Sequence, residues 1–379
     1  MSIKNYNFSF NQIWDYQHPI RQAFHKNYCD TVLCRAKLML GFIRMIKMCS
    51  WTVSELPKPT NDCERVKYDL DHWGYGLLEG ALTDPLLGNV RKRLLDQAAA
   101  EKELGHAFED GGPEQKWGEF RDKNGKLQPE VFTAKNGGIN QRVWLLPNKG
   151  QEFIDILEID AMYETVGHVL GEEFQLSSFS SNIAKPGGSK MNLHTDQWWA
   201  PEPTRLGRRN LPVGSMTRSI FDFDPDRTEP PIALAPAACS NAIFMMNDFT
   251  DINGGTRLVP RSHLMGRHPD PVKDANIKTV AAEGSAGTAI ITDGRIWHGT
   301  GSNRTDENRV AMLLTFCGPQ YRPQVNYTIA LDPEVLEQAT DRQKTMFGLK
   351  VWWGYGRTGH PSVEFINPSD KGLGQLNPS

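Results

Sequence analysis

The stretch Met191-Asn-Leu-His-Thr-Asp-Gln-Trp-Trp199 decides how the rest of the sequence is interpreted. His194 and Asp196 are separated by a single residue, and residues two apart on a β-strand point to the same face. An imidazole and a carboxylate can therefore converge on one point from one short strand. They supply two of the three ligands of a two-histidine, one-carboxylate facial triad. That ligand set suits non-haem Fe(II) and leaves positions open for O2 and a co-substrate.

A second stretch, further along the chain, supplies the missing groups. It reads Ala289-Ile-Ile-Thr-Asp-Gly-Arg-Ile-Trp-His-Gly-Thr-Gly-Ser-Asn303, and it is followed by Arg309-Val-Ala-Met-Leu-Leu-Thr-Phe316. The first run is β-prone up to a turn signal at Asp293-Gly294, and a new β-prone run starts at Arg309. We expect a hairpin that places His298 on one strand and Arg309 on its neighbour. His298 would complete the triad, and Arg309 would offer a planar, two-pronged donor to a carboxylate.

A third motif lies between these two stretches and reads Asn253-Gly-Gly-Thr-Arg-Leu-Val-Pro-Arg-Ser-His263. The three motifs, in this order, resemble the phytanoyl-CoA dioxygenase family of Fe(II)/2-oxoglutarate oxygenases. The resemblance is greatest to members that act in bacterial and fungal small-molecule metabolism. In that family the middle motif usually ends Pro-Gly-Ser-His, whereas here Arg261 replaces the glycine, which bears on the local turn but removes no ligand. The resemblance covers about residues 66 to 355, which is most of the chain.

The resemblance implies a mainly β fold with flanking helices. It predicts a double-stranded β-helix, a cupin-like jelly roll, with the metal between its two sheets. Residues 63–379 would form this domain, and the long proline-rich segment 200–239 would be a lid over the metal. Residues 1–62 match nothing in the resemblance and are interpreted as an N-terminal extension and linker. Three interpretations of its segment Val32–Met48 stay open: a basic amphipathic helix for a membrane surface or partner, a helix that packs on the body or on another subunit, and a poorly ordered segment.

Local patterns predict the elements around the motifs. Val66–Leu78 is expected to be the first strand, and Thr83 to cap a helix that runs from Pro85 to about Glu103. A strand is expected over residues 139–146 and a helix over 152–170. Ala311–Cys317 is expected to be a core strand.

The resemblance also assigns roles in the site. His194, Asp196 and His298 would bind the iron, and Arg309 would bind the distal carboxylate of 2-oxoglutarate. In oxygenase-like halogenases the position of Asp196 is Ala or Gly, so the aspartate favours oxygen chemistry. His263 is expected to fix its loop rather than to bind metal.

Further side chains are assigned to the co-substrate and substrate. Thr256 would add a hydroxyl to the 2-oxoglutarate site, and Asn192 would reach its metal-side carboxylate. Trp198, Trp199 and Trp144 are candidate walls of the substrate pocket, with ordinary aromatic core as the alternative.

Composition limits the classes of protein that remain. The chain has 379 residues, of which 39% are hydrophobic and 23% charged, as in a soluble globular protein with a large core. A net charge of −3 favours neither nucleic acid nor an anionic membrane surface. No apolar run reaches the roughly 18 residues of a membrane span. The six cysteines show no C-x-x-C spacing and no secretory signal precedes them, so we expect reduced thiols and a cytoplasmic protein.

The predicted function is an Fe(II)/2-oxoglutarate-dependent dioxygenase that uses O2 to oxidise an unactivated C–H bond of a small-molecule metabolite. It would release succinate and CO2. One alternative is an acyl-CoA 2-hydroxylase, for which Arg205, Arg208 and Arg209 would supply a basic patch. Another is a metal-binding jelly-roll protein without catalysis, and a third is an interaction module in residues 1–62. A homodimer is left open.

Overall fold

The computed structural model describes residues 51–110, 124, 138–197, 236–265, 268–359 and 363–367. The chain divides into two compact units, Met1–Ser50 and Trp51–Ser379, and all described residues belong to the second. Trp51 and Leu56 are buried in a hydrophobic core of the second unit. The domain boundary expected between residues 62 and 63 stays a prediction.

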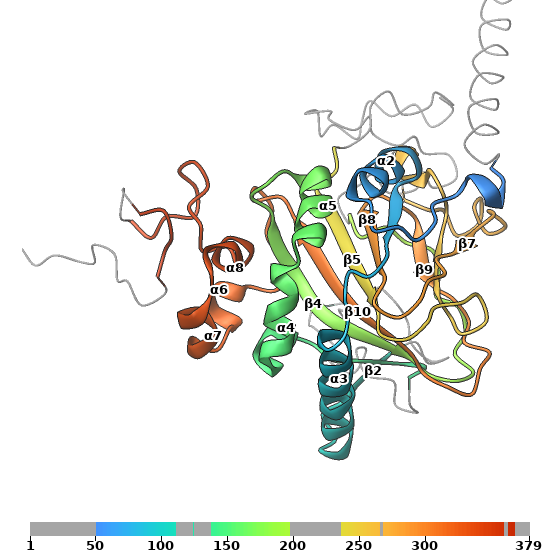
Figure 1. Cartoon of the computed structure of the whole chain (residues 1–379), viewed down its shortest axis with the longest axis horizontal. Helices are drawn as coiled ribbons and strands as arrows, with labels where there is room; N and C mark the ends of the chain where they lie inside the picture. Colours follow the sequence, from blue (N-terminus) through green and yellow to red (C-terminus); the bar gives the residue numbers. More distant parts are fainter. Residues whose placement is uncertain are drawn as a thin grey trace, which may run out of the picture. The chain divides into compact units, whose positions relative to one another are not determined.

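A large antiparallel sheet is the main element of the second unit (Figure 1). Its strands follow the order β1-β8-β5-β10-β4-β3-β2. Their bounds are β1 Tyr75–Leu78, β2 Phe108–Asp110, β3 Asn140–Arg142, β4 Gln175–Ala184, β5 Cys239–Met245, β8 Ala289–Asp293 and β10 Arg309–Cys317. The expected core strand at Ala311–Cys317 is confirmed as most of β10.

A smaller antiparallel sheet has the order β7-β6-β9. Its strands are β6 Thr256–Leu258, β7 Val280–Ala281 and β9 His298–Thr300. His194 joins its edge through an isolated antiparallel bridge to His298. The smaller sheet therefore holds two of the three expected metal ligands.

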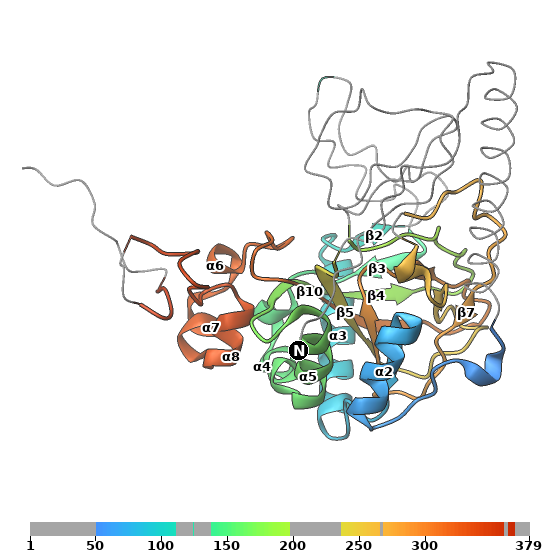
Figure 2. The same ribbon diagram turned by 90° about the horizontal axis from the view of Figure 1, so that it is seen from above.

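Helices cover one face of the large sheet. Figure 2 shows α2, α3, α4 and α5 on the same side of β4, β5 and β10. The helices are η1 Val53–Glu55, α2 Cys63–Trp73, α3 Leu86–Glu103, η3 Leu146–Lys149, α4 Gln151–Asp155, η4 Ile156–Glu158, α5 Asp160–Leu170, η6 Ser262–Leu264, α6 Tyr327–Ala330, α7 Pro333–Gln338 and α8 Asp341–Met346. None of the helices in the described ranges combines the length and the apolar character needed to cross a bilayer.

Alternate residues of the large sheet belong to two different cores, as the two-residue period of a strand requires. Phe244 and Leu314 pack in the core that the helices cover. Ile243 and Ile290 pack in a second core, together with Leu258 of the small sheet. Each such buried side chain contributes about 1.5–3 kcal/mol. Two antiparallel sheets with an apolar interior between them, and helices outside, form the predicted jelly roll.

The expected strand over Val66–Leu78 is wrong for most of its length. Its first part lies in α2, where the Asp62 side chain accepts hydrogen bonds from the backbone N–H groups of Glu64 and Arg65. Val66, Leu70 and Trp73 are buried at helical spacing. Gly74, at φ 84°, ends the helix, and only the last four residues form β1. The next expected helix is confirmed as α3, with Pro85 rather than Thr83 at its N-cap.

The expected hairpin between His298 and Arg309 is also wrong. His298 lies on β9 of the small sheet, whereas Arg309 begins β10 of the large sheet, so the two strands are not neighbours. The chain crosses between the sheets before and after β9. Ile296 and Trp297, in the first crossing, are fully buried, which holds β9 away from β8.

Two further expectations about elements need correction. The helix expected over residues 152–170 is interrupted at η4, after which Ile159 is extended at ψ 108° and α5 begins. The strand expected over residues 139–146 ends at Arg142. Leu145 adopts a left-handed conformation at φ 54°, and Pro147 lies in the η3 turn, so the ladder does not continue.

Candidate metal centre

His194, Asp196 and His298 lie together between the two sheets. One donor atom from each lies within 4.8 Å of the others, and this is the only such group in the described ranges that could hold a metal. The His298 Nε2 atom is 3.3 Å from Asp196 Oδ2, and the His194 Nε2 atom is 3.7 Å from Asp196 Oδ1. The two ring centroids are 4.5 Å apart. The structure therefore brings together the three side chains that the sequence singled out.

Both imidazoles are oriented by backbone carbonyls two residues earlier. His194 Nδ1 is 3.1 Å from the Asn192 carbonyl oxygen, and His298 Nδ1 is 3.2 Å from that of Ile296. A carbonyl oxygen can only accept, so each Nδ1 carries the proton and donates it. Each Nε2 then has a free lone pair facing Asp196, which is the tautomer that binds a metal.

Backbone hydrogen bonds position the short His194 segment. The strand expected here is reduced to one bridge, in which His194 and His298 exchange N–H to O bonds of 2.9 Å in both directions. The carbonyl of Gly294 accepts a bond from the Asp196 N–H at 3.1 Å and another from Thr195 Oγ1 at 3.0 Å. The predicted Asp293-Gly294 turn thus anchors the ligand segment as well as ending β8.

The charges of the three groups suit a cation. Surrounding protein and the neighbouring His298 lower the pKa of His194 to about 4, so this imidazole is neutral at pH 7. Its side chain is 41% exposed, so solvent offsets part of that lowering. Burial alone would raise the pKa of Asp196, but His298 and His194 outweigh it and keep the carboxylate charged. Burial opposes protonation of His298, yet Asp196 raises the pKa of that imidazole, so a metal and a proton compete for it.

Arg309 is a buried cation that has no anionic partner among the described residues. Its side chain is enclosed at the start of β10, with the residue 1% exposed. Its Nε donates to the Gly254 carbonyl at 3.1 Å, and its guanidinium lies 5.0 Å from the Phe249 ring centroid. Within the described ranges, no carboxylate lies at ion-pair distance from it. Burial, with the charge of Arg142, lowers the pKa of Arg309 to about 9, so it remains charged at pH 7. An unpaired buried charge is costly, which fits a site for an anionic ligand.

Thr256 is buried near the residue that contacts Arg309, whereas the side chain of Asn192 is exposed. Thr256 is buried on β6, two residues after the carbonyl that Arg309 bonds, and it faces Thr300 in the ladder. Asn192 contributes its backbone carbonyl to His194, while the residue itself is exposed. The predicted contacts of their side chains with 2-oxoglutarate stay predictions.

Two polar residues near the centre escaped the sequence analysis. Asn241 of β5 donates from Nδ2 to Asp196 Oδ2 at 2.8 Å. Arg142 of β3 donates from Nε to Asp110 Oδ2 at 2.9 Å, and its charge contributes to the lowered pKa of both His194 and Arg309. Neither residue belongs to a motif, and each reaches the site from a strand distant in sequence. Only the strand register could have indicated them.

Hydroxyl groups line the inner face of the large sheet beside the centre. Thr315 faces Asn241 on one side and Ser178 on the other, and Ser180 is two residues from Ser178 on the same face. In the described part of the chain, none of these three hydroxyls has a hydrogen-bond partner. Thr315 is only half-buried, although β10 is a central strand backed by the helix-covered core.

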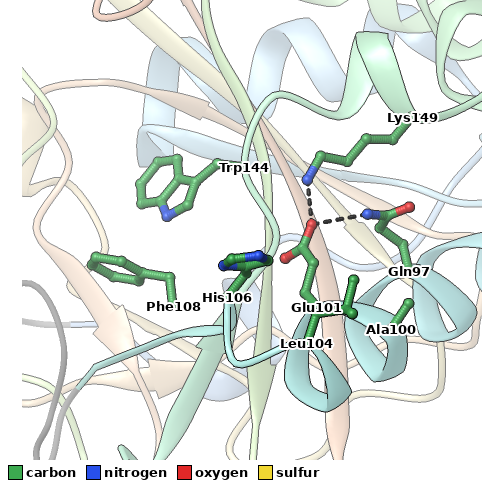
Figure 3. Close-up of a pocket in the computed structure, with 8 residues that line it drawn as sticks. All are labelled: Gln97, Ala100, Glu101, Leu104, His106, Phe108, Trp144 and Lys149. Atoms are coloured by element: carbon green, nitrogen blue, oxygen red, sulfur yellow. Dashed lines mark hydrogen bonds and ion pairs between the residues drawn. The ribbon is translucent and has the colours of Figure 1, made fainter.

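Trp144 lies in a pocket that contains none of the proposed iron ligands. The pocket has a volume of about 420 Å³ and is lined by Gln97, Ala100, Glu101, Leu104, His106, Phe108, Trp144 and Lys149. Trp144 packs edge-on against Phe108, and Lys149 and Gln97 both donate to Glu101 (Figure 3). Trp198, Trp199 and lid residues 200–235 lie outside the described residues. The assignment of the three tryptophans to substrate stays a prediction.

The Pro-Arg-Ser-His loop supports the His298 strand. Arg261 adopts a left-handed conformation at φ 67°, which glycine takes up without strain and which accounts for the glycine of the related motif. Ser262 Oγ accepts a 2.7 Å hydrogen bond from the Trp297 N–H, next to the proposed ligand His298. His263 is 2% exposed and its Nε2 lies 3.3 Å from the Asp71 carbonyl. These contacts join the loop to β9 and α2.

Comparison with known proteins agrees with the motifs. The sequence profile of the family "Phytanoyl-CoA dioxygenase (PhyH)" matches residues 119–311, just over half of the chain. "Dioxygenase af480" of Aspergillus fumigatus is 28% identical over 211 residues, 55% of this chain and 59% of that protein. "Multifunctional dioxygenase prhA" of Penicillium brasilianum is 27% identical over 207 residues, 52% and 60% of the two chains. The match therefore spans about three fifths of the length of these relatives.

Solved structures resemble this chain with lower sequence identity than the relatives above. HygX from Streptomyces hygroscopicus, with nickel, 2-oxoglutarate and hygromycin B bound, aligns with 14% identity and a TM-score of 0.47, covering 68% of this chain and 88% of that one. The likeness at that score is only general, and the assignment rests on the family profile. That profile includes His194, Asp196, His298 and Arg309 within its matched range. The chain belongs to the phytanoyl-CoA dioxygenase family.

Proposed function

We propose that the protein is an Fe(II)/2-oxoglutarate-dependent dioxygenase that oxidises an unactivated C–H bond of a small-molecule metabolite. The observation that carries the proposal is the triad, in which both Nε2 atoms face the carboxylate of Asp196. Two imidazoles and one carboxylate form the facial set that Fe(II) oxygenases use. A structural zinc site would instead close around the metal with a fourth protein ligand.

The buried cation supports 2-oxoglutarate as the co-substrate. A 2-oxo acid can chelate the metal through one end, and its far carboxylate then requires a cation at a distance. Arg309 has that character, because it is charged, buried and without a carboxylate partner among the described residues. The nearby Thr256 hydroxyl can donate a second hydrogen bond to the same carboxylate. A dicarboxylate therefore completes a site that is otherwise electrostatically unsatisfied.

The residues of the chain bind, orient and exclude water, while the bound groups supply the oxidising power. With Fe(II) bound, O2 would oxidise 2-oxoglutarate to succinate and CO2. One oxygen atom of O2 would enter the succinate and the other would be delivered to the substrate. His194 and His298 keep their Nε2 atoms free because backbone carbonyls hold their Nδ1 protons. Arg309 sets the direction of the co-substrate, and the half-buried Thr315 on the inner face of the large sheet is where we infer that a substrate makes contact. Catalysis then depends on the position of one C–H bond relative to the metal.

The proposal also covers the class of substrate, the cellular location and the oligomeric state. We infer that the substrate is a free small molecule. Arg205, Arg208 and Arg209, which an acyl-CoA 2-hydroxylase would use, lie outside the described residues, so that function stays the alternative. We infer a cytoplasmic location, where thiols stay reduced, and the described Cys63, Cys239 and Cys317 are free. A homodimer remains compatible with this function.

An anaerobic titration with Fe(II) and 2-oxoglutarate tests the proposal. The chelate should produce its weak metal-to-ligand charge-transfer band at about 500 nm. Replacing Asp196 or His298 by Ala should abolish the band. Replacing His168, a partly exposed histidine of α5 that pairs with Asp71, should leave it unchanged. Iron binding without the band would remove the co-substrate from the proposal and favour a metal-binding protein without catalysis.

A further inference from the structure

Asn241 is a neutral residue in direct contact with a proposed metal ligand. It lies on the inner face of β5 and is 3% exposed. Its Nδ2 donates to Asp196 Oδ2 at 2.8 Å and to Thr292 Oγ1 at 3.2 Å. Thr292 faces it directly from the neighbouring strand β8. Both N–H groups of the amide therefore donate hydrogen bonds, one to the proposed ligand Asp196 and one to Thr292 of β8.

The amide has only one orientation that suits its surroundings. A charged carboxylate accepts hydrogen bonds but cannot donate them, so the NH2 group of Asn241 must face Asp196. In that orientation the Asn241 Oδ1 atom is buried and has no hydrogen-bond partner. A buried unpaired carbonyl costs about 1–3 kcal/mol. An apolar residue of similar size would avoid this cost, so stability alone does not explain an asparagine at this position.

The contact restricts what Asp196 can do as a ligand. Each carboxylate oxygen faces one imidazole, Oδ2 at 3.3 Å from His298 Nε2 and Oδ1 at 3.7 Å from His194 Nε2, but only Oδ2 also accepts the hydrogen bond from Asn241. A facial triad needs open positions on the metal, and a chelating 2-oxo acid fills two of them. A second bond from the carboxylate would occupy the position that O2 requires. The Asn241 hydrogen bond takes up one lone pair of Oδ2 and draws charge from it, so the two oxygens differ as donors and binding through both at once is disfavoured.

We propose that Asn241 is a positioning residue that limits Asp196 to one bond with the metal and so keeps a coordination position open. The inference rests on the proposed function, because it presupposes a metal at the triad. It adds a role for a residue in β5 that no motif marks. Outer hydrogen-bond partners of metal ligands typically change metal affinity by about 10–100-fold when they are removed.

The test compares Asn241→Leu with a matched control, Ser240→Ala. Leucine has a similar size and no hydrogen bond to Asp196. Ser240 is the adjacent, fully buried residue of β5, and its Oγ donates to the Thr292 carbonyl at 2.8 Å without touching Asp196. Both variants lose a buried hydrogen bond on the same strand, but only one of these bonds reaches a ligand. Thr292→Val removes the second contact of the amide and provides a weaker form of the same change.

Three measurements are made without turnover. Thermal melting of the metal-free protein reports folding, and anaerobic calorimetric titration with Fe(II) reports metal affinity. Nitric oxide, added to the protein with Fe(II) and 2-oxoglutarate, reports the open position through its half-integer-spin EPR signal. For Asn241→Leu we expect an unchanged or higher melting temperature. Fe(II) binding should weaken by about 10–100-fold, because the carboxylate is no longer held in its orientation, and the nitric oxide signal per bound Fe(II) should fall. Thr292→Val should change the last two in the same direction by less, and Ser240→Ala should change neither.

The possible results separate the inference from the function. Equal Fe(II) affinity and equal nitric oxide signal in Asn241→Leu and the wild type would overturn the positioning role. The same losses in Ser240→Ala would also overturn it, because a general disturbance of β5 would then explain them. If the wild-type protein binds no Fe(II), the proposed function itself fails. If Asn241→Leu does not fold, the Thr292→Val variant decides the question with the same two readouts.

Discussion

At Arg309, the buried charge is proposed to bind the distal carboxylate of 2-oxoglutarate. Replacing it by Ala should weaken 2-oxoglutarate binding by about 30-fold to several thousand-fold, because losing a buried charge-assisted pair costs about 2–5 kcal/mol. The dissociation constant can be measured by titrating the Fe(II)-loaded protein. Arg304→Ala is the control, since Arg304 is exposed and pairs with Asp251. A change of tenfold or less in Arg309→Ala would count against the assignment.

Sequence could indicate some residues of the site and not others. His194, Asp196 and His298 are indicated by spacing and residue type, and Arg309 follows them at a recognisable distance. Asn241 could not be indicated, because an asparagine in an apolar strand has no distinguishing chemistry of its own. Its contact with Asp196 depends on the fold, which brings β5 next to a segment 45 residues earlier. Long-range contacts of neutral residues leave no local pattern.

Among the elements, the end of α2 depends on close packing against the His263 loop. A Cβ atom at Gly74, where φ is 84°, would lie 2.5 Å from His263 Nδ1, whereas one at Gly80, where φ is 64°, would meet nothing within 4 Å. Gly80→Ala should therefore cost only the left-handed backbone strain, about 1–2 kcal/mol. Gly74→Ala should cost that plus the collision, about 3 kcal/mol or more.

Equilibrium unfolding in urea measures both glycine variants, with Gly80→Ala as the control for backbone strain. Both variants should expose the same surface on unfolding, so the slope of the transition should be equal and the midpoint should report stability alone. The midpoint should fall further for Gly74→Ala. Equal midpoints would mean that the His263 ring moves aside at no cost. The contact between α2 and the Pro-Arg-Ser-His loop would then contribute little to stability.

Some helices and strands could be predicted from the sequence and others could not. β10 could be predicted because its apolar run alternates between two buried faces. The segment Cys63–Trp73 was misread, because Val66, Leu70 and Trp73 fit a helical period only when Asp62 is recognised as its cap. The separation of β9 from β10 could not be predicted, because two sequential strands normally pair. Here a crossing with Ile296 and Trp297 buried carries the chain from β8 to β9 in the small sheet, and a more exposed one carries it back to β10.

For the whole molecule, the first fifty residues form a unit separate from the jelly roll. A chain that starts at Trp51 retains all the described contacts of the metal centre. We expect it to bind Fe(II) and 2-oxoglutarate with dissociation constants within about twofold of the full chain, since each measured ligand is held by the second unit. The titration used for the triad measures this. A folded Trp51–Ser379 chain that binds neither would assign residues 1–50 a part in the centre.

The two histidines of the centre differ in exposure, with side chains 41% exposed at His194 and 9% at His298. Water therefore has access to the metal mainly along one side, and the bond to His194 is the one that solvent or a competing chelator reaches first. Exchange with the cell's pool of free iron would proceed by release at that side while His298 and Asp196 still hold the ion.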